Sequence, residues 1–313
     1  MKKKIFRILK NIIILILLFS VFGFCVVKIT DIGKYDKFIF EKEETIETFT
    51  LHPNQNSRVN TDDVRGYGNK AIFAIDKIQN SIDEAKNKTD EQIKICINTL
   101  IPSEELEQIQ SYFLIYYGFA DVKDAISYKV GNYFNYMVLV VDMEKINKAE
   151  RIKEWTDKEI RLMTDAIDKK KSDKEKVKEA AEIVAATIEY TEGYRDIYSA
   201  VKEHKGVCNS YAMLMKGICD RLNFHTDICF GYADEETAKD KTSYHAWNRI
   251  KLSNGKYIYS DLTAYDTSKN DEDIFMDSSP YNIIGLNTYL FDNSIEYPAK
   301  IQALSVIMVD FQP

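Results

Sequence analysis

The chain has 313 residues and a mass of 36.3 kDa, which suits two modest domains or one domain with an extension. Hydrophobic residues make up 45% of it and aromatic residues 12%, with only 5 Pro and 12 Gly, so disordered and collagenous classes are excluded. The net charge is -7, and no stripe of Lys and Arg interleaved with aromatic side chains occurs. These features argue against a nucleic-acid partner.

The N-terminus carries a membrane signal. Basic side chains crowd the first ten residues, and an uncharged, almost wholly apolar run follows over 12–27. At about 1.5 Å per residue this run covers roughly 24 Å of the ~30 Å hydrocarbon core. A helix of this length spans the membrane only if the side chains of Lys10 and Lys28 extend to the two membrane–water interfaces. We expect an uncleaved, single-pass anchor within residues 1–30, with the basic tail in the cytoplasm and the bulk of the chain outside the cell membrane.

Two alternatives to the anchor stay open. A cleaved signal peptide is the first, although no A-x-A-like site follows the run and Phe24 before Cys25 is too bulky for lipoprotein processing. A buried helix of a soluble protein is the second, but such a helix would not usually carry a polybasic flank.

Residues 31–60 are polar and charged and predict a stalk, and residues 61–150 predict a small α+β region. Apolar residues at helical spacing predict helices over 68–86 and 102–117. Stretches rich in β-branched and aromatic residues predict strands over 93–98 and 133–142. No chemical motif is evident in this region.

A second domain is expected over 151–313. A charged helical segment over 149–171 leads into it, and Ser172-Asp173 offers an N-cap for a helix over 174–190. A further strand is expected over 226–232.

The five cysteines contain one candidate nucleophile. They are Cys25, Cys96, Cys208, Cys219 and Cys229, with no CxxC pair, so neither a metal site nor a disulfide scaffold is indicated. A glycine turn precedes Cys208, and the residues after it have the spacing of one helical face up to Leu222. Unpaired N–H groups and the helix dipole at a helix start favour a thiolate, whereas Cys219 and Cys229 have the placement of structural residues.

A β-hairpin is predicted downstream, from two alternating runs on either side of Asn254-Gly255. His245 opens its first strand and Asp261 closes its second. A two-residue turn would put these side chains on opposite faces. A three-residue loop over 253–255, with Gly255 in the left-handed conformation, would put them side by side on one face. The second register also gathers the apolar residues Ile250, Leu252, Ile258 and Leu262 on the opposite face, so we expect the three-residue loop, with His245 and Asp261 facing Cys208.

A cysteine, a histidine that can take its proton and an aspartate that can orient the histidine are the components of an acyl-transfer triad. The segments GVCNSYAMLM, SYHAWNRI and NGKYIYSDLTAYD resemble the Cys, His and Asp motifs of the transglutaminase-like superfamily, which shares its core with papain-like cysteine enzymes. The order of the three motifs agrees, as do the Gly-Val before Cys208, Trp247 after His245 and the Asp-x-Thr at Asp261.

This resemblance covers about residues 175–270 and implies roles for the three residues. Cys208 would be the nucleophile, His245 the general base and acid, and Asp261 the orienting carboxylate. It implies an α+β fold in which the Cys-bearing helix packs on an antiparallel sheet, and it implies no cofactor. The backbone N–H of Cys208 can donate a hydrogen bond to the oxyanion, and Tyr190 and Tyr198 are candidate side-chain donors to it.

Other charged or metal-binding arrangements are less specific. His204 and His225 could join Cys219 or Cys229 at a metal, but the spacings fit no known ligand pattern. The acidic stretches 234–241 and 270–273 lack the spaced ligands of a calcium loop and are expected to be solvated loops.

The sequence therefore predicts a membrane-anchored, extracytoplasmic transglutaminase-like cysteine enzyme. It would act on amide bonds of a protein or peptide, by hydrolysis or by acyl transfer through a thioester. A cell-wall remodelling peptidase is one form of this hypothesis. A non-catalytic binding or scaffolding module at the cell surface is the alternative.

Overall fold

The computed structural model describes residues 59–287 apart from 61–62, 65, 86–91, 98, 131–136 and 233–243. The predicted anchor at 1–30 and nearly all of the predicted stalk at 31–60 lie outside the described residues. Within the described part of the chain, no helix is both long and apolar enough to cross a membrane. All described residues belong to one compact unit, Glu43–Pro313.

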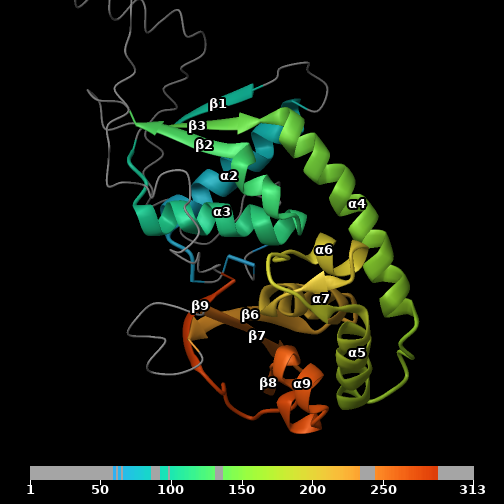
Figure 1. The fold of residues 1–313 in the computed structure, drawn as a ribbon. Coiled ribbons are helices and arrows are strands. Elements are labelled where there is room, and N and C mark those ends of the chain that lie inside the picture. The colour runs from blue at the N-terminus through green and yellow to red at the C-terminus, as the bar shows by residue number, and fades with distance from the viewer. Residues whose placement is uncertain are drawn as a thin grey trace, which may run out of the picture. The chain divides into compact units, whose positions relative to one another are not determined.

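The N-terminal region is a three-stranded antiparallel sheet with helices packed beside it (Figure 1). Its elements are α2 (Asn69–Ala85), β1 (Gln92–Ile97), α3 (Ser103–Tyr117), the 3-10 helix η2 (Ala120–Ala125), β2 (Ile126–Val130) and β3 (Met137–Asp142). The strand order is β1-β3-β2. The predicted helices and the first predicted strand are confirmed to within a few residues, and the second predicted strand is confirmed over 137–142, its first four residues lying outside the described part of the chain. The sequence predicted neither η2 nor β2.

Helix α4 (Met143–Asp165) belongs to both hydrophobic clusters of the molecule. Met143 and Ile146 pack in the N-terminal cluster, whereas Ile160 packs in the C-terminal one. The helix begins earlier than the predicted start of the charged segment at residue 149, because the side chain of Asp142 caps the amides of Glu144 and Lys145. The predicted boundary between residues 150 and 151 falls inside this helix.

The C-terminal region is built on a four-stranded antiparallel sheet of order β8-β7-β6-β9. Its strands are β6 (His225–Tyr232), β7 (Tyr244–Lys251), β8 (Tyr257–Ser260) and β9 (Asn282–Leu286). Its helices are α5 (Asp173–Thr187), α6 (Ile197–Lys202), α7 (Cys208–Arg221), α9 (Leu262–Ser268) and the 3-10 helix η3 (Asp271–Asp273). The short strands β4 (Glu189–Tyr190) and β5 (Lys205–Gly206) pair in parallel just before α7. The helix predicted over 174–190 ends at Thr187, and the sequence did not predict β4, β5, α6, α9, η3 or β9.

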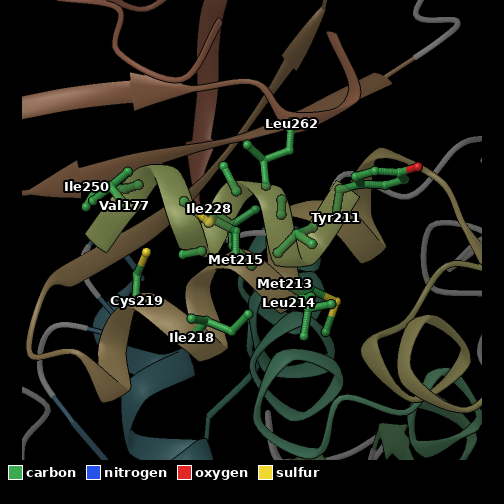
Figure 2. Close-up of a cluster of buried hydrophobic side chains, with 14 of the residues drawn as sticks. Val177, Tyr211, Met213, Leu214, Met215, Ile218, Cys219, Ile228, Ile250 and Leu262 are labelled. Atoms are coloured by element: carbon green, nitrogen blue, oxygen red, sulfur yellow. The ribbon is translucent and has the colours of Figure 1, made fainter. Parts of the chain in front are cut away.

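Helix α7 forms the centre of the C-terminal core. It packs against α5 and against strands β6 and β7. Leu214, Met215 and Ile218 on the helix and Ile250 on β7 have no exposed surface, and Figure 2 shows these side chains in one cluster. Burial of one such side chain contributes about 1.5–3 kcal/mol. This burial stabilises the packing of α7 against the sheet.

This architecture agrees with the predicted α+β class, since a helix that begins with Cys208 packs on an antiparallel sheet. The predicted cap of α5 is also present. Ser172 accepts from the amide of Glu175, and the Glu175 carboxylate accepts in return from the amide of Ser172.

Candidate active site

Cys208 is the first residue of α7 and is 8% exposed. The chain reaches it through Gly206, which pairs with Tyr190 across the β4–β5 ladder. A Cβ on Gly206 would lie 2.5 Å from Cβ of Ser210, so only glycine permits this close approach. The thiol lies 4.0 Å from the carbonyl oxygen of Tyr244, the first residue of β7. The helix start and the strand start thus meet at one point.

The hairpin of β7 and β8 has the predicted three-residue loop. Ile250 pairs with Ile258, and Leu252 donates to the carbonyl of Lys256 at 2.9 Å, which leaves residues 253–255 as the loop. Gly255 has a φ of 82°, in the left-handed region. Ile250, Leu252 and Ile258 are buried in the C-terminal core, as the register predicted. The second strand ends at Ser260, earlier than predicted, and Leu262 is buried in that core from helix α9 instead.

The register places His245 beside Asp261. Nε2 of His245 lies 2.8 Å from Oδ2 of Asp261. The other carboxylate oxygen, Oδ1, accepts from the amides of Thr263 at 3.1 Å and Ala264 at 3.2 Å, so Asp261 also caps helix α9. Because Nε2 faces Asp261, Nδ1 is the imidazole nitrogen left to face the thiol.

The charges of this pair support each other. Burial opposes ionisation of Asp261, but the hydrogen bond and charge of His245, the amide of Ala264 and the hydroxyl of Tyr281 together lower the pKa of its carboxyl. Burial also opposes protonation of His245. Hydrogen bonds to Asp261 and Cys208 and the charges of both outweigh burial and raise the pKa of His245 to about 10. An imidazolium therefore lies between the carboxylate and the thiol.

Two aromatic rings enclose the imidazole, and the sequence analysis missed one of them. Trp247 lies nearly parallel to His245 with the ring centres 6.0 Å apart, and Tyr281 meets His245 edge-on at 5.2 Å. Tyr281 also donates a hydrogen bond of 3.0 Å to Oδ2 of Asp261. No local pattern marked Tyr281, because the pairing of β9 with β6 brings it to the site.

The other cysteines in the described part of the chain are Cys96, Cys219 and Cys229. Cys219 and Cys229 have no exposed surface, and burial raises the pKa of both thiols, that of Cys229 to about 12. Burial also raises the pKa of the Cys96 thiol, on strand β1 of the other sheet. The structural roles expected for Cys219 and Cys229 agree with these surroundings.

The structure separates the two tyrosines named as candidate oxyanion donors. Tyr198 packs edge-on against Phe119 and Trp155, and no contact of its side chain with Cys208, His245 or Asp261 is seen among the described residues. Tyr190 is 51% exposed, and burial of the rest of its side chain together with the nearby Cys208 raises the pKa of its hydroxyl. Tyr190 therefore remains the candidate of the two.

Within the described residues, His204, His225 and the acidic stretch 270–273 form no metal site; the acidic stretch 234–241 lies outside the described residues. His204 contacts the carbonyl oxygen of Thr187 through Nδ1 at 3.1 Å, and His225 lies 3.3 Å from Asp227. No group of three His, Cys, Asp or Glu residues that could hold a metal ion occurs in the described ranges. Residues Asp271–Asp273 form η3, capped by the side chain of Asn270.

A cavity of about 610 Å³ lies elsewhere, lined mainly by α3, α4 and α7. Tyr116, Ile160, Met213 and Lys216 are among its lining residues, and none of Cys208, His245 and Asp261 is. The chemistry described above is therefore not at this cavity.

The fold and site together define an α+β domain that presents a cysteine at a helix start to a histidine and aspartate on a hairpin. Residues 160–262 match the family model of the transglutaminase-like superfamily. The matched range contains all three residues. The chain thus carries a transglutaminase-like domain, and the resemblance noted in its sequence is confirmed there.

Other comparisons add little beyond this match. A solved structure described as a crystal structure of a TGase is similar, with 15% sequence identity and a TM-score of 0.31. The similarity covers 59% of this chain and 54% of that one, so the chain spans about half of that protein's length. No curated protein matches the chain.

Proposed function

We propose that this protein is a membrane-anchored, extracytoplasmic cysteine enzyme that acts on amide bonds. The observation that carries the proposal is the 2.8 Å contact of His245 with Asp261 beside the thiol at the start of α7. A buried structural histidine would not require an aspartate on one nitrogen and a cysteine on the other. The transglutaminase-like domain over 160–262 supports the same assignment.

The first half of the reaction forms a thioester. The sulfur of Cys208 attacks the carbonyl carbon of a carboxamide or peptide bond, and the carbonyl oxygen takes the negative charge. The N–H of Cys208, a first-turn donor without an acceptor within its helix, can hydrogen-bond this oxygen. His245 then gives its Nδ1 proton to the leaving nitrogen, and the C–N bond breaks.

The second half resolves the thioester. A water molecule or a primary amine attacks the carbonyl carbon, and neutral His245 takes the proton of the attacking group. The C–S bond breaks and the sulfur leaves with the electron pair of that bond, while His245 carries the proton taken from the attacking group, so the site is ready for another cycle. Asp261 keeps the imidazole oriented throughout. Water would make the protein a peptidase or amidase, including one for cell-wall peptide, and an amine would make it an acyltransferase.

An amine-incorporation experiment tests the proposal. The full-length protein in detergent is incubated with glutamine-containing peptides and a fluorescent primary amine, and the products are analysed by mass spectrometry. We expect labelled peptide in the case of transfer, or new carboxylates in the case of hydrolysis, with Cys208→Ala inactive and Cys219→Ala active. Equal product from Cys208→Ala and the wild type would contradict the enzyme assignment and leave the binding module.

The membrane part of the proposal rests on the sequence. A reporter that is active only outside the cytoplasm, fused after residue 31, is expected to be active. An inactive reporter there would contradict the topology. N-terminal sequencing of the mature protein distinguishes an anchor from a cleaved signal, because cleavage would give a new N-terminus near residue 28.

A further inference from the structure

Tyr281 contacts the same carboxylate oxygen that His245 uses. Its hydroxyl donates to Oδ2 of Asp261 at 3.0 Å, and Nε2 of His245 lies 2.8 Å from that oxygen. Tyr281 lies beyond residue 262, where the family match ends. The part of the chain that follows the matched domain therefore reaches back to the site.

The ring of Tyr281 also restricts the imidazole. It meets His245 edge-on, with the ring centres 5.2 Å apart and an interplanar angle of 89°. It meets Trp247 at 5.2 Å and 78°, while Trp247 lies nearly parallel to the imidazole at 18°. Edge-to-face packing of this kind holds three rings in one mutual arrangement.

A hydroxyl bridge holds Tyr281 in place. Ser279 accepts from Nε1 of Trp247 at 3.1 Å and donates to the carbonyl oxygen of Tyr281 at 2.7 Å. The next residue, Asn282, opens β9 and pairs with Tyr232 on β6. The tyrosine is thus attached to the central sheet on one side and to Trp247 on the other.

Asp261 needs these donors because it is only 2% exposed. Its Oδ1 accepts hydrogen bonds from the amides of Thr263 and Ala264. Its Oδ2 accepts from His245 and from the hydroxyl of Tyr281. A buried carboxylate remains ionised only when such donors replace water.

The charged groups around Asp261 set the hydrogen-bonding role of Tyr281. His245 faces Asp261 from β7, with Cys208 behind the imidazole, and Asp273 acts on Tyr281 from η3. Burial and the negative charge of Asp261 raise the pKa of Tyr281 to about 12. Its hydroxyl thus keeps its proton and can donate.

We propose that Tyr281 is a positioning residue of this site, which holds Oδ2 of Asp261 in line with His245 and keeps the carboxylate ionised. The inference rests on the proposed function, since it assigns a role around the same three residues. Tyr281 touches no reacting atom and acts only through Asp261 and His245.

Titration of Asp261 tests this inference without a substrate. The full-length protein in detergent, labelled with ¹³C at aspartate carboxyls, is titrated by NMR, and Asp261→Asn assigns the signal. Tyr281→Phe removes the hydroxyl and keeps the ring. We expect the midpoint of the Asp261 titration to rise by about one pH unit, since one hydrogen bond to a charge is lost.

Tyr112→Phe is the matched control. It also removes one hydroxyl, which accepts from Gln79 at 2.8 Å within the N-terminal core. We expect Tyr112→Phe to lower thermal stability and to leave the Asp261 midpoint at the wild-type value. Coincident midpoints in Tyr281→Phe and the wild type would overturn the inference and leave Tyr281 a packing residue.

Two further variants keep the outcome decisive. If Tyr281→Phe does not fold, Ser279→Ala, which removes the bridge to Trp247, should raise the Asp261 midpoint by a smaller amount, and no rise would overturn the inference. Unchanged alkylation of Cys208 in His245→Ala would defeat the proposed function. The Asp261 titration would still show separately whether Tyr281 supports the carboxylate.

Discussion

His245 and Asp261 are sixteen positions apart in the chain, and their side chains meet at 2.8 Å, with His245 on β7 and Asp261 directly after the end of β8. A slip of one residue in the pairing would send one of them to the other face. The geometry of the candidate site thus depends on the length of a three-residue loop.

Gly255 is expected to control this loop. Its φ of 82° is costly for any residue with a branched side chain, although no atom would obstruct a Cβ there. Gly255→Val should therefore lower the free energy of unfolding by about 1–2 kcal/mol. Gly255→Asn should cost less, because asparagine tolerates the left-handed region. Urea denaturation measures both, and equal losses would contradict a conformational cause.

The three buried cysteines of the C-terminal region should respond differently to truncation. Cys208→Ala should abolish acyl-transfer activity and alkylation at the site while barely changing stability. Cys219→Ala and Cys229→Ala should keep activity and lower the free energy of unfolding by about 1 kcal/mol, since each leaves a small void in a filled core. Thermal melts and peptide mapping after alkylation measure these effects, and an unfolded Cys208→Ala would contradict the assignment.

Stability should depend on pH through the His245–Asp261 pair. The folded pKa of His245 is raised from 6.5 to about 10, so its contribution is complete below pH 6.5 and is lost as the pH rises toward 10. The folded pKa of Asp261 is lowered below 3.8, so its contribution is present above pH 3.8 and is lost as the pH falls through the folded value. The pair should therefore stabilise most between about pH 4 and 6.5.

Unfolding of the wild type and of His245→Gln across this pH range measures the contribution. The difference between the two proteins should shrink from pH 6.5 to 10. A difference that grows toward alkaline pH would show that the imidazole is buried without its proton.

Lys216 should be important for stability, because its ammonium is fully paired. The side chain is 12% exposed and donates to Asp220 at 2.8 Å, to Asp63 at 3.2 Å and to the carbonyl of Thr226 at 2.8 Å. Lys216→Met should lower the free energy of unfolding by about 2–3 kcal/mol, since hydrogen bonds to a charged group are lost. Lys256→Met removes an exposed pair with Asp277, which water screens, and should lower the free energy of unfolding much less. Similar losses in calorimetry would contradict this difference.

The sequence by itself determined most of what lies close along the chain. The spacing of apolar residues in α7, the cap at Ser172 and the alternation on both sides of Asn254-Gly255 depend on neighbours within a few positions. These local rules were sufficient to place Cys208 at a helix start. They also predicted His245 and Asp261 on one face of the hairpin.

Only the tertiary structure decided which distant segments meet. The position of Tyr281 beside Asp261 follows from the pairing of β9 with β6. Tyr198 is no longer a candidate oxyanion donor, because its ring packs against Phe119 and Trp155. Helix α4 likewise packs in both hydrophobic clusters, because apolar side chains at each of its ends are buried against a different part of the chain. Such contacts are chosen by sheet order and by complementary apolar surfaces far apart in the chain, which no local periodicity records.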